Sequence, residues 1–310
     1  MLTREIIMEK AREYGADLCG FGDISLFAGT DPQRNPLCIL PTAKSVLGFA
    51  FRTPRALYET AERGYQYANL TTMGVKVLDE ECSEIFLLKM ARLIENEGYD
   101  ACVQRRVSNL RIKGDHTQNP EVVDTYELSL AEAVAPGKPA PDVILDFAQA
   151  AEICGMGKAG RTGSVLTPRF GPFQRFVFIV TNLPFETYDA PFSQDLCDGC
   201  MECAKACKGN AIDEHGLDTW QCSVYYRGAH GSNPYMTDEI LADEPDREAI
   251  LRGEKRFDRE SARAIYPKLD FLPSHLKGYS PCMCGKACDL ACYRHLMARR
   301  AELQKECDKR

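Results

Sequence analysis

The chain has 310 residues, 45% hydrophobic and 27% charged, and is long enough for one large domain or two ordinary ones. Its formal net charge of −7 argues against a broad phosphate-binding surface, and hence against a nucleic-acid partner. It has no apolar run of about 18 residues and no apolar signal core in residues 1–20, so we expect a cytoplasmic protein without a membrane segment. In that compartment, its fifteen cysteines suit metal ligation better than disulfides.

The first third of the sequence predicts a mixture of helices and strands. In chain order we expect a helix over 3–14 with Ile6, Ile7 and Ala11 on its apolar face, strands over 18–22 and 45–51, a helix over 73–97 and a strand over 100–104. The helix over 73–97 is the clearest of these, because Phe86, Met90 and Ile94 recur with the helical period and Gly98 follows them.

The middle of the chain is rich in glycine. After a polar loop over 104–141, residues 142–157 predict a helix, and 163–168 and 175–184 predict two neighbouring strands, the second of them buried. Glycines stand at positions 155, 157, 160, 163 and 171. They allow the backbone to lie close to a flat or bulky ligand, but their spacing is not that of a dinucleotide fingerprint.

The strongest signal is a run of cysteines with the spacing Cys-x2-Cys-x2-Cys-x3-Cys, formed by Cys197, Cys200, Cys203 and Cys207. This is the bacterial ferredoxin pattern, in which three thiolates hold one cubane cluster and the fourth reaches a second cluster. A second group follows at Cys282, Cys284, Cys288 and Cys292, with Cys222 between the two groups. Zinc knuckles or disulfides are the alternatives, but zinc sites usually consist of two Cys-x2-4-Cys pairs. We therefore predict two [4Fe–4S] clusters.

Residues 223–281, between the two cysteine groups, are rich in Tyr, Pro and charge, and they predict two surface helices within 239–269. Two interpretations remain open for this segment. It is either a surface insertion, which loops tolerate well, or a cover that lines a substrate cavity and excludes water. After Cys292 the sequence predicts a basic helix.

The order of these motifs resembles one family. The chain contains AREYGADLCGFGDI, TAKSVLGFAF, LIENEGYDA and AAEICGMGKAGRTGSVLTPRFGPFQRFVFIVTNLP, and the cysteine module follows them. Segments like these recur in this order in the epoxyqueuosine reductases, which are relatives of the reductive dehalogenases.

The resemblance implies an α/β (α+β) fold in which a nitroreductase-like cobalamin-binding domain, residues 1–190, is fused to a two-[4Fe–4S] ferredoxin-like module. That module would span residues 191–310, with an insertion at about 223–281. We expect base-off cobalamin to lie against Gly155, Met156, Gly157, Gly160, Gly163, Thr167, Pro168, Gly171 and Pro172.

The resemblance also implies a crossed ligand set for the clusters. One cluster would be held by Cys197, Cys200, Cys203 and Cys292, and the other by Cys207, Cys222, Cys284 and Cys288. The second motif departs from the family spacing, so Cys282 is a possible substitute for Cys284.

The region of the expected proton donor departs further from the family. The Asp-(Ser/Thr)-Ala-Pro element is replaced by PDVILDFAQ, which leaves Asp142 or Asp146 as the candidate acid. Tyrosines are the other candidates, namely Tyr65, Tyr67, Tyr225 and Tyr226. We therefore expect a reductase for a small organic substrate, supplied by a low-potential donor such as ferredoxin or flavodoxin. The alternatives are an electron-transfer protein that reduces a corrinoid protein, or an iron–sulfur reductase without cobalamin.

Overall fold

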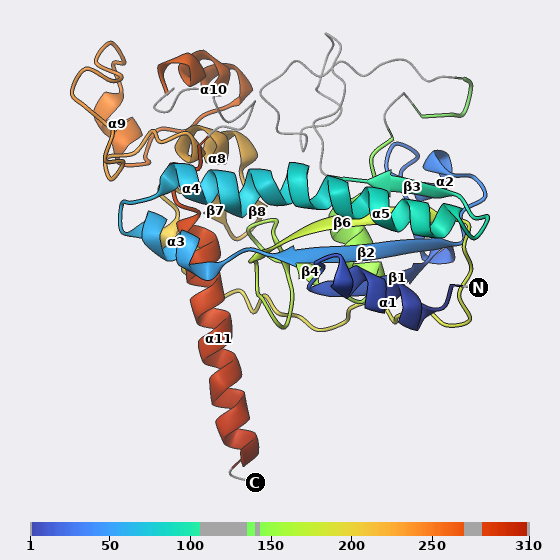
Figure 1. The fold of residues 1–310 in the computed structure, drawn as a ribbon. Helices are drawn as coiled ribbons and strands as arrows, with labels where there is room; N and C mark the ends of the chain where they lie inside the picture. The colour runs from blue at the N-terminus through green and yellow to red at the C-terminus, as the bar shows by residue number, and fades with distance from the viewer. Residues whose placement is uncertain (1, 106–134, 140–142, 270–280, 309–310) are drawn as a thin grey trace. The chain divides into compact units, whose positions relative to one another are not determined.

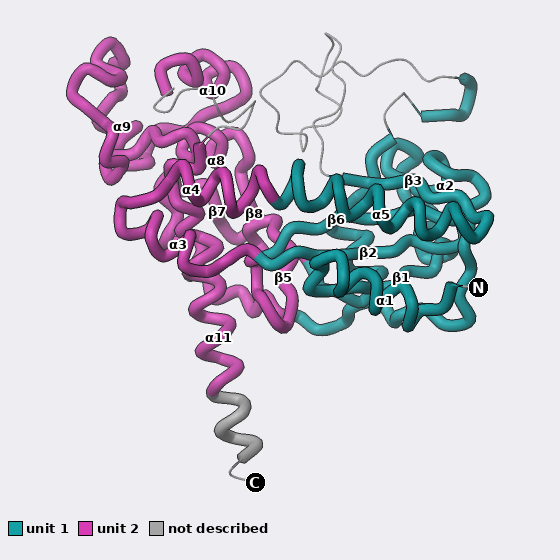
Figure 2. The backbone as a smooth tube through the Cα atoms, viewed as in Figure 1, with its two compact units in different colours: residues 1–52, 78–158, 174–195 teal, residues 53–77, 159–173, 196–310 magenta. Residues whose placement is uncertain are grey.

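The computed structural model describes residues 2–105, 135–139, 143–269 and 281–308, which form a mixed α/β fold (Figure 1). The chain divides into two compact units, each built from three stretches of sequence (Figure 2). Unit 1 comprises 1–52, 78–158 and 174–195, and unit 2 comprises 53–77, 159–173 and 196–310. The division expected between residues 190 and 191 stays a prediction. No helix in the described part of the chain has both the length and the apolarity to cross a membrane.

Unit 1 is organised around a four-stranded antiparallel sheet with the strand order β1-β2-β6-β3. The strands are β1 (Leu18–Asp23), β2 (Ser45–Arg52), β6 (Gln174–Thr181) and β3 (Ala101–Gln104). The helices are α1 (Arg4–Glu13), η1 (Ile24–Phe27), α2 (Pro36–Ile39), α5 (Ser83–Glu95) and α6 (Phe147–Ile153). All four strands predicted within this unit are confirmed.

Both faces of the central strands are buried, as the unbroken apolar run of β2 predicts. Side chains alternate between the two faces, so Leu47, Phe49 and Phe51 enter one core, in which they meet Phe86 and Met90 of α5. The intervening residues face the other side, where α6 packs.

A pair of glycines makes room on that second face. Gly20 and Gly48 are direct partners in the β1–β2 register. A Cβ at Gly20 would stand 2.2 Å from the Cys154 carbonyl oxygen, and one at Gly48 would stand 2.6 Å from the Met156 sulfur. The end of α6 thus packs directly on bare backbone, and the side chain of Met156 is 6% exposed.

Three helix predictions need correction. Ile6 is not on the buried face of α1, since its side chain is 37% exposed. The helix expected over 142–157 begins at Phe147, because Asp146 serves as its N-cap and accepts hydrogen bonds from Ala148 N and Gln149 N. The helix expected over 73–97 is present, but its first part is η2 (Thr72–Cys82), a wide π-helical segment that runs directly into α5.

Unit 2 is mainly helical. Its elements are α3 (Arg55–Glu62), α4 (Tyr67–Thr71), β5 (Val165–Leu166), α7 (Glu202–Ala206), β7 (Ile212–Asp213), β8 (Gly216–Leu217), α8 (Thr219–Tyr226), α9 (Arg247–Leu251), α10 (Arg259–Ile265), η3 (Tyr266–Lys268) and α11 (Ala287–Asp308). Helices α9, α10 and α11 confirm the two surface helices and the C-terminal helix that the sequence predicts.

The segment 163–168 was wrongly predicted to neighbour the strand at 175–184. Only Val165 and Leu166 are in a strand, and β5 pairs with β4 (Lys158–Ala159). The reason is that both edges of β6 are already paired, one with β2 and the other with β3.

Several apolar side chains of residues 229–269 enter the core of unit 2. Leu241, Ile250 and Phe257 are buried against Val224 and Tyr225 of α8. The Tyr225 hydroxyl donates to Ile250 O at 2.9 Å. The described part of the predicted insertion therefore stabilises the helix that carries Cys222.

Candidate metal centre

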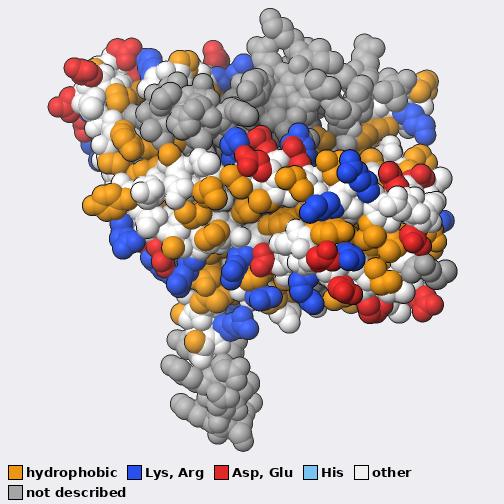
Figure 3. All heavy atoms as spheres, viewed as in Figure 1, with side chains coloured by type: hydrophobic (Ala, Val, Ile, Leu, Met, Phe, Trp, Pro, Cys, Tyr) orange, Lys and Arg blue, Asp and Glu red, His pale blue; other side chains and the backbone are white. Residues whose placement is uncertain are grey.

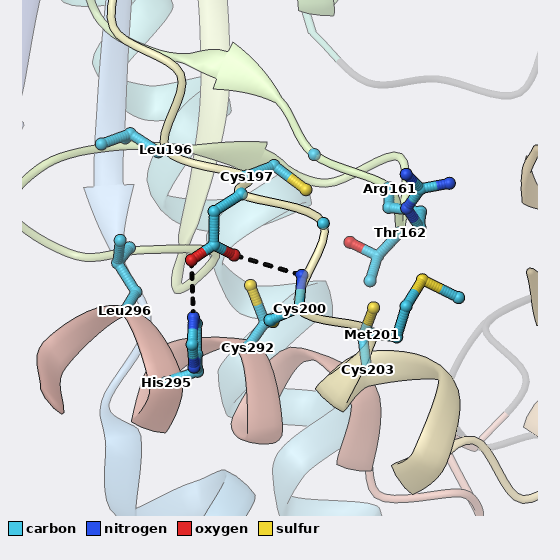
Figure 4. Close-up of a pocket in the computed structure, with 13 residues that line it drawn as sticks. Arg161, Thr162, Leu196, Cys197, Cys200, Met201, Cys203, Cys292, His295 and Leu296 are labelled. Carbon is cyan, nitrogen blue, oxygen red and sulfur yellow. Dashed lines mark hydrogen bonds and ion pairs between the residues drawn. The ribbon is translucent and has the colours of Figure 1, made fainter. Parts of the chain in front are cut away.

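Four cysteines line one pocket of unit 2 (Figure 4). Cys197, Cys200 and Cys203 come from the segment that leads into and begins α7, and Cys292 comes from α11. Positive φ angles at Gly199 (76°) and Met201 (61°) curl this segment around the pocket.

The thiols of this pocket lie within electrostatic reach of one another. Burial raises the pKa of Cys292 to about 12, and the Asp289 carboxylate is the second cause. The thiols of Cys203, Cys197 and Cys200 raise the Cys292 pKa further. The structure thus brings together the four residues that the resemblance assigns to one cluster.

Asp198 ties the loop of this pocket to α11. Its Oδ2 accepts from His295 Nε2 at 2.9 Å and from Arg299 Nη1 at 2.7 Å, and its Oδ1 accepts from Cys200 N at 3.2 Å. The His295 bond is the largest cause that holds the pKa of Asp198 well below its usual range. Asp198, Cys200 and His295 each offer a ligand atom within 4.8 Å of the others, so they could also hold a single metal ion.

The remaining predicted ligands form a second thiol group in unit 2. Burial raises the pKa of Cys222, on α8, to about 12, and Cys284 and Cys207 raise it further. Burial also holds the pKa of Cys288, on α11, well above its usual range, and Asp289, Cys284 and Cys222 are the next causes. Electrostatic effects on the pKa values of Cys222 and Cys288 therefore connect four thiols, those of Cys207, Cys222, Cys284 and Cys288.

Cys282 lies at the edge of this second group. Its Sγ is 3.9 Å from Cys284 Sγ, and its amide donates to Thr71 Oγ1 at 2.7 Å. The side chain is fully buried in an apolar cluster that contains Tyr67 and Leu290. Its contact with Cys284 is the largest cause that holds the pKa of Cys284 well above its usual range.

The chemistry of these donors fits iron–sulfur clusters. Buried thiols with raised pKa values ionise only where metal charge compensates the thiolate. Cys207 Sγ also accepts a hydrogen bond from Ala211 N at 3.2 Å, a contact of the kind that adjusts the potential of a cluster. Each group of four thiols could therefore ligate a metal centre, and four thiols suit either a cubane cluster or zinc.

Two of the candidate tyrosines lie beside the second thiol group. Tyr67 is 6% exposed, and its pKa is raised first by burial and then by Cys284 and Cys282. Tyr226 packs on the same apolar cluster, and its carbonyl oxygen accepts from Met283 N at 2.8 Å. Tyr65 is 69% exposed. Tyr225 is buried, and its hydroxyl is already bonded to Ile250 O.

Of the two candidate acids, the structure describes Asp146. Asp142 falls outside the described residues. Asp146 belongs to unit 1, where it caps α6 and accepts from Arg34 Nη1 at 3.0 Å. Both of its oxygens are thus occupied by structural contacts, and its role as a proton donor stays a prediction.

The glycine-rich block is packed largely against the chain itself. A Cβ at Gly155 would stand 2.9 Å from Ala190 O, one at Gly160 would stand 2.9 Å from a Leu166 methyl carbon, and one at Gly171 would stand 3.2 Å from the Tyr293 ring. Thr167 and Gly171 exchange two backbone hydrogen bonds of 2.9 Å, which close the turn containing Pro168. These contacts give Gly155, Gly160 and Gly171 a packing role, and the role of the block toward cobalamin stays a prediction.

Sequence reasoning missed Asp198, His295 and Arg299 as parts of the site. The available signal was helical spacing, because Cys288, Cys292, His295 and Arg299 recur along one side of α11. A lone Asp between two cysteines carries no signal of its own.

Comparison with known proteins agrees with the cysteine chemistry. The family described as a 4Fe-4S binding domain matches residues 190–213. An epoxyqueuosine reductase of Bacillus cereus is 27% identical over 66% of this chain and 45% of that protein. A tetrachloroethene reductive dehalogenase of Sulfurospirillum multivorans is 38% identical over 19% of this chain and 12% of that protein. A solved epoxyqueuosine reductase in complex with a tRNA-Tyr stem loop has a TM-score of 0.45 and 19% identity, over 86% of this chain and 68% of that one.

The first cysteine motif thus lies in a domain of the 4Fe-4S binding class, which confirms an iron–sulfur protein. The chain is similar to epoxyqueuosine reductases over 66–74% of its length and to a reductive dehalogenase over 19% of it, which confirms the predicted resemblance. The matched region covers about half the length of these epoxyqueuosine reductases.

His230 is expected to make the protein less stable below pH 6.5. The side chain is 3% exposed, Nε2 lies 3.2 Å from Met283 O and must donate to it, and burial lowers the pKa from 6.5 to about 4. Between these pH values the unfolded chain takes up a proton that the folded chain excludes. The free energy of unfolding should therefore fall by roughly 3 kcal/mol as the pH drops from 6.5 to 4.

Denaturant unfolding of wild type and His230→Gln at several pH values checks this expectation. The acid lability of any cluster affects both proteins equally, so it drops out when their free energies of unfolding are subtracted. The wild type should show the steeper loss. Equal slopes in the two proteins would contradict the assignment.

Proposed function

We propose that the chain is a cobalamin-dependent iron–sulfur reductase that acts on a small organic substrate by reductive elimination, dehalogenation or deoxygenation. The observation that carries the proposal is the division of eight cysteines into two groups of four within unit 2. Two clusters would pass single electrons from a low-potential ferredoxin or flavodoxin toward the substrate.

The proposed ligands follow the crossed set. Cys197, Cys200, Cys203 and Cys292 would hold one cluster, and Cys207, Cys222, Cys284 and Cys288 the other. The electrostatic coupling of Cys284 to both Cys222 and Cys288 supports Cys284 over Cys282.

The proposed cobalamin-binding domain is residues 1–190, with nitroreductase-like topology, next to a ferredoxin-like module over 191–310. The block from Gly155 to Pro172 would seat the cofactor, which when bound supplies a cobalt centre able to reduce the substrate. Among the proton donors, Tyr67 is supported by its position, because the side chain is buried beside Cys282 and Cys284 of the second thiol group. Tyr226, Asp142 and Asp146 are the alternatives.

Two other functions are weighed against this one. The epoxyqueuosine reductases to which the chain is similar make a tRNA nucleoside the second candidate substrate. The net charge of −7 favours a small molecule, and Figure 3 shows basic and acidic side chains interspersed on the face drawn. An electron-transfer protein that reduces a corrinoid partner would need the two clusters but no cofactor of its own.

Anaerobic reconstitution with iron, sulfide and cobalamin, followed by gel filtration, tests the proposal. We expect about eight irons per chain, as two cubane clusters require. We also expect corrinoid absorption bands that elute with the protein. Clusters without retained corrinoid would favour the electron-transfer protein or a cobalamin-free reductase.

About four irons per chain would refute the second cluster, and stoichiometric zinc would refute both clusters. Addition of a tRNA stem loop to the reconstituted protein separates the substrate classes, because tight binding at physiological salt would overturn the small-molecule assignment.

A further inference from the structure

Arg161 stands at the edge of the pocket formed by Cys197, Cys200, Cys203 and Cys292. It lies in the turn between β4 and β5, which is closed by a 2.9 Å hydrogen bond from Gly160 N to Ser164 O. Figure 4 shows Arg161 and Thr162 at one side of the pocket and His295 and Leu296 at the other.

The turn and the guanidinium are both anchored within unit 2. Ser164 Oγ donates to the buried Asp289 carboxylate of α11 at 3.1 Å. Arg161 Nη1 donates to Asp213 O at 3.2 Å and also to Glu214 O, both in the β7–β8 hairpin. Arg161 Nη2 lies 4.0 Å from the place a Cβ on Gly199 would occupy, so the guanidinium extends over the cysteine loop.

These contacts leave one donor without a partner. Among the buried side-chain nitrogen and oxygen atoms of the described residues, Arg161 Nε alone has no hydrogen-bond partner. A buried orphan N–H costs about 1–3 kcal/mol, so such a group in a native protein calls for an acceptor.

The Nε and Nη2 hydrogens of arginine point the same way and form a fork for an anion. Elsewhere in this chain that fork holds a carboxylate, since Arg252 donates from Nε at 3.0 Å and from Nη2 at 2.9 Å to Glu254. At Arg161, Nη1 is committed to carbonyl oxygens, and the Nε side of the fork is unused.

We propose that Arg161 donates from this fork to the sulfur atoms of the cluster in the Cys197–Cys292 pocket and raises its reduction potential. The inference rests on the proposed function for the presence of that cluster. The reduced cluster carries one more negative charge than the oxidised one, so a fixed cation at hydrogen-bond distance stabilises the reduced form more. Asp198 cannot play this part, because its carboxylate is an acceptor and is already bonded to His295 and Arg299.

The test is a dithionite titration of the reconstituted protein followed by electron paramagnetic resonance. Arg161→Gln should shift the equilibrium of one cluster about tenfold toward the oxidised form, which is about 59 mV for one electron. Arg161→Lys, which keeps the charge and loses the planar fork, should shift it less. The matched control Arg252→Gln removes an equal charge from an exposed ion pair and should shift neither cluster.

Cys200→Ala identifies which signal belongs to the pocket cluster. An unchanged potential in Arg161→Gln with wild-type iron content would overturn this inference alone, as would equal shifts in Arg161→Gln and Arg252→Gln. Wild-type protein that binds no iron would overturn the proposed function as well. If Arg161→Gln assembles no cluster, the Arg161→Lys variant is measured instead. A wild-type reduction potential in Arg161→Lys would refute donation from the arginine fork to the cluster.

Discussion

Replacing Cys207 by alanine is expected to remove about half of the bound iron while the cluster in the Cys197–Cys292 pocket remains. Cys207 belongs to the first motif in sequence, but it lies at the far end of α7 from that pocket and raises the pKa of Cys222. Iron should fall from about eight to about four atoms per chain. Iron and sulfide analysis, with paramagnetic resonance of the reduced protein, measures the change.

The exposed Cys38 supplies the control, since Cys38→Ala should keep all of the iron. Cys200→Ala should remove the other half and a different resonance signal. If Cys207→Ala and Cys200→Ala abolish the same signal, each motif ligates its own cluster and the crossed assignment is wrong.

The second large effect concerns the folding of unit 1. Asp79 of η2 and Arg175 of β6 form a bidentate pair, with Arg175 Nε donating to Asp79 Oδ1 at 2.7 Å and Nη2 donating to the second oxygen. The two side chains are only 4% and 12% exposed. Arg175→Met would leave a carboxylate buried without its cation, so the free energy of unfolding should fall by about 3–5 kcal/mol.

Denaturant unfolding of Arg175→Met, Asp79→Leu and the double variant measures this pair. The double variant should regain most of the loss, because a well-packed apolar pair can replace a buried ion pair. A loss below about 1 kcal/mol in Arg175→Met would show that the pair behaves like an exposed one.

The strands and the chemistry of the cysteines could be predicted because each depends on local pattern. The run from Val46 to Phe51 is apolar at every side chain since both faces of β2 are covered, and periodicity located the apolar face of α5. Cysteine spacing alone indicated an iron–sulfur protein. Chain-wide order of motifs indicated the family.

What could not be predicted depends on contacts between distant residues. The fit of Met156 over Gly48 needs the β1–β2 register, and the displacement of 163–168 from the sheet follows from the pairing of β6 with β2 and β3. Asp198 and His295 meet only because α11 returns to the first cysteine loop. The spacing of apolar residues in the sequence gives no sign that η2 is a π-helix rather than an α-helix.

The use of α11 for both thiol groups bears on how the protein is made. Cys203 and Cys292 face one pocket although about ninety positions separate them. The proposed cluster would therefore close a long loop, and the chain loses conformational entropy before the fourth ligand can bind the metal. During synthesis, the first three cysteines would leave the ribosome as an incomplete ligand set, well before α11 emerges. Cluster insertion should therefore wait for α11 and complete the folding of unit 2, and metal-free protein should be most open to proteolysis there.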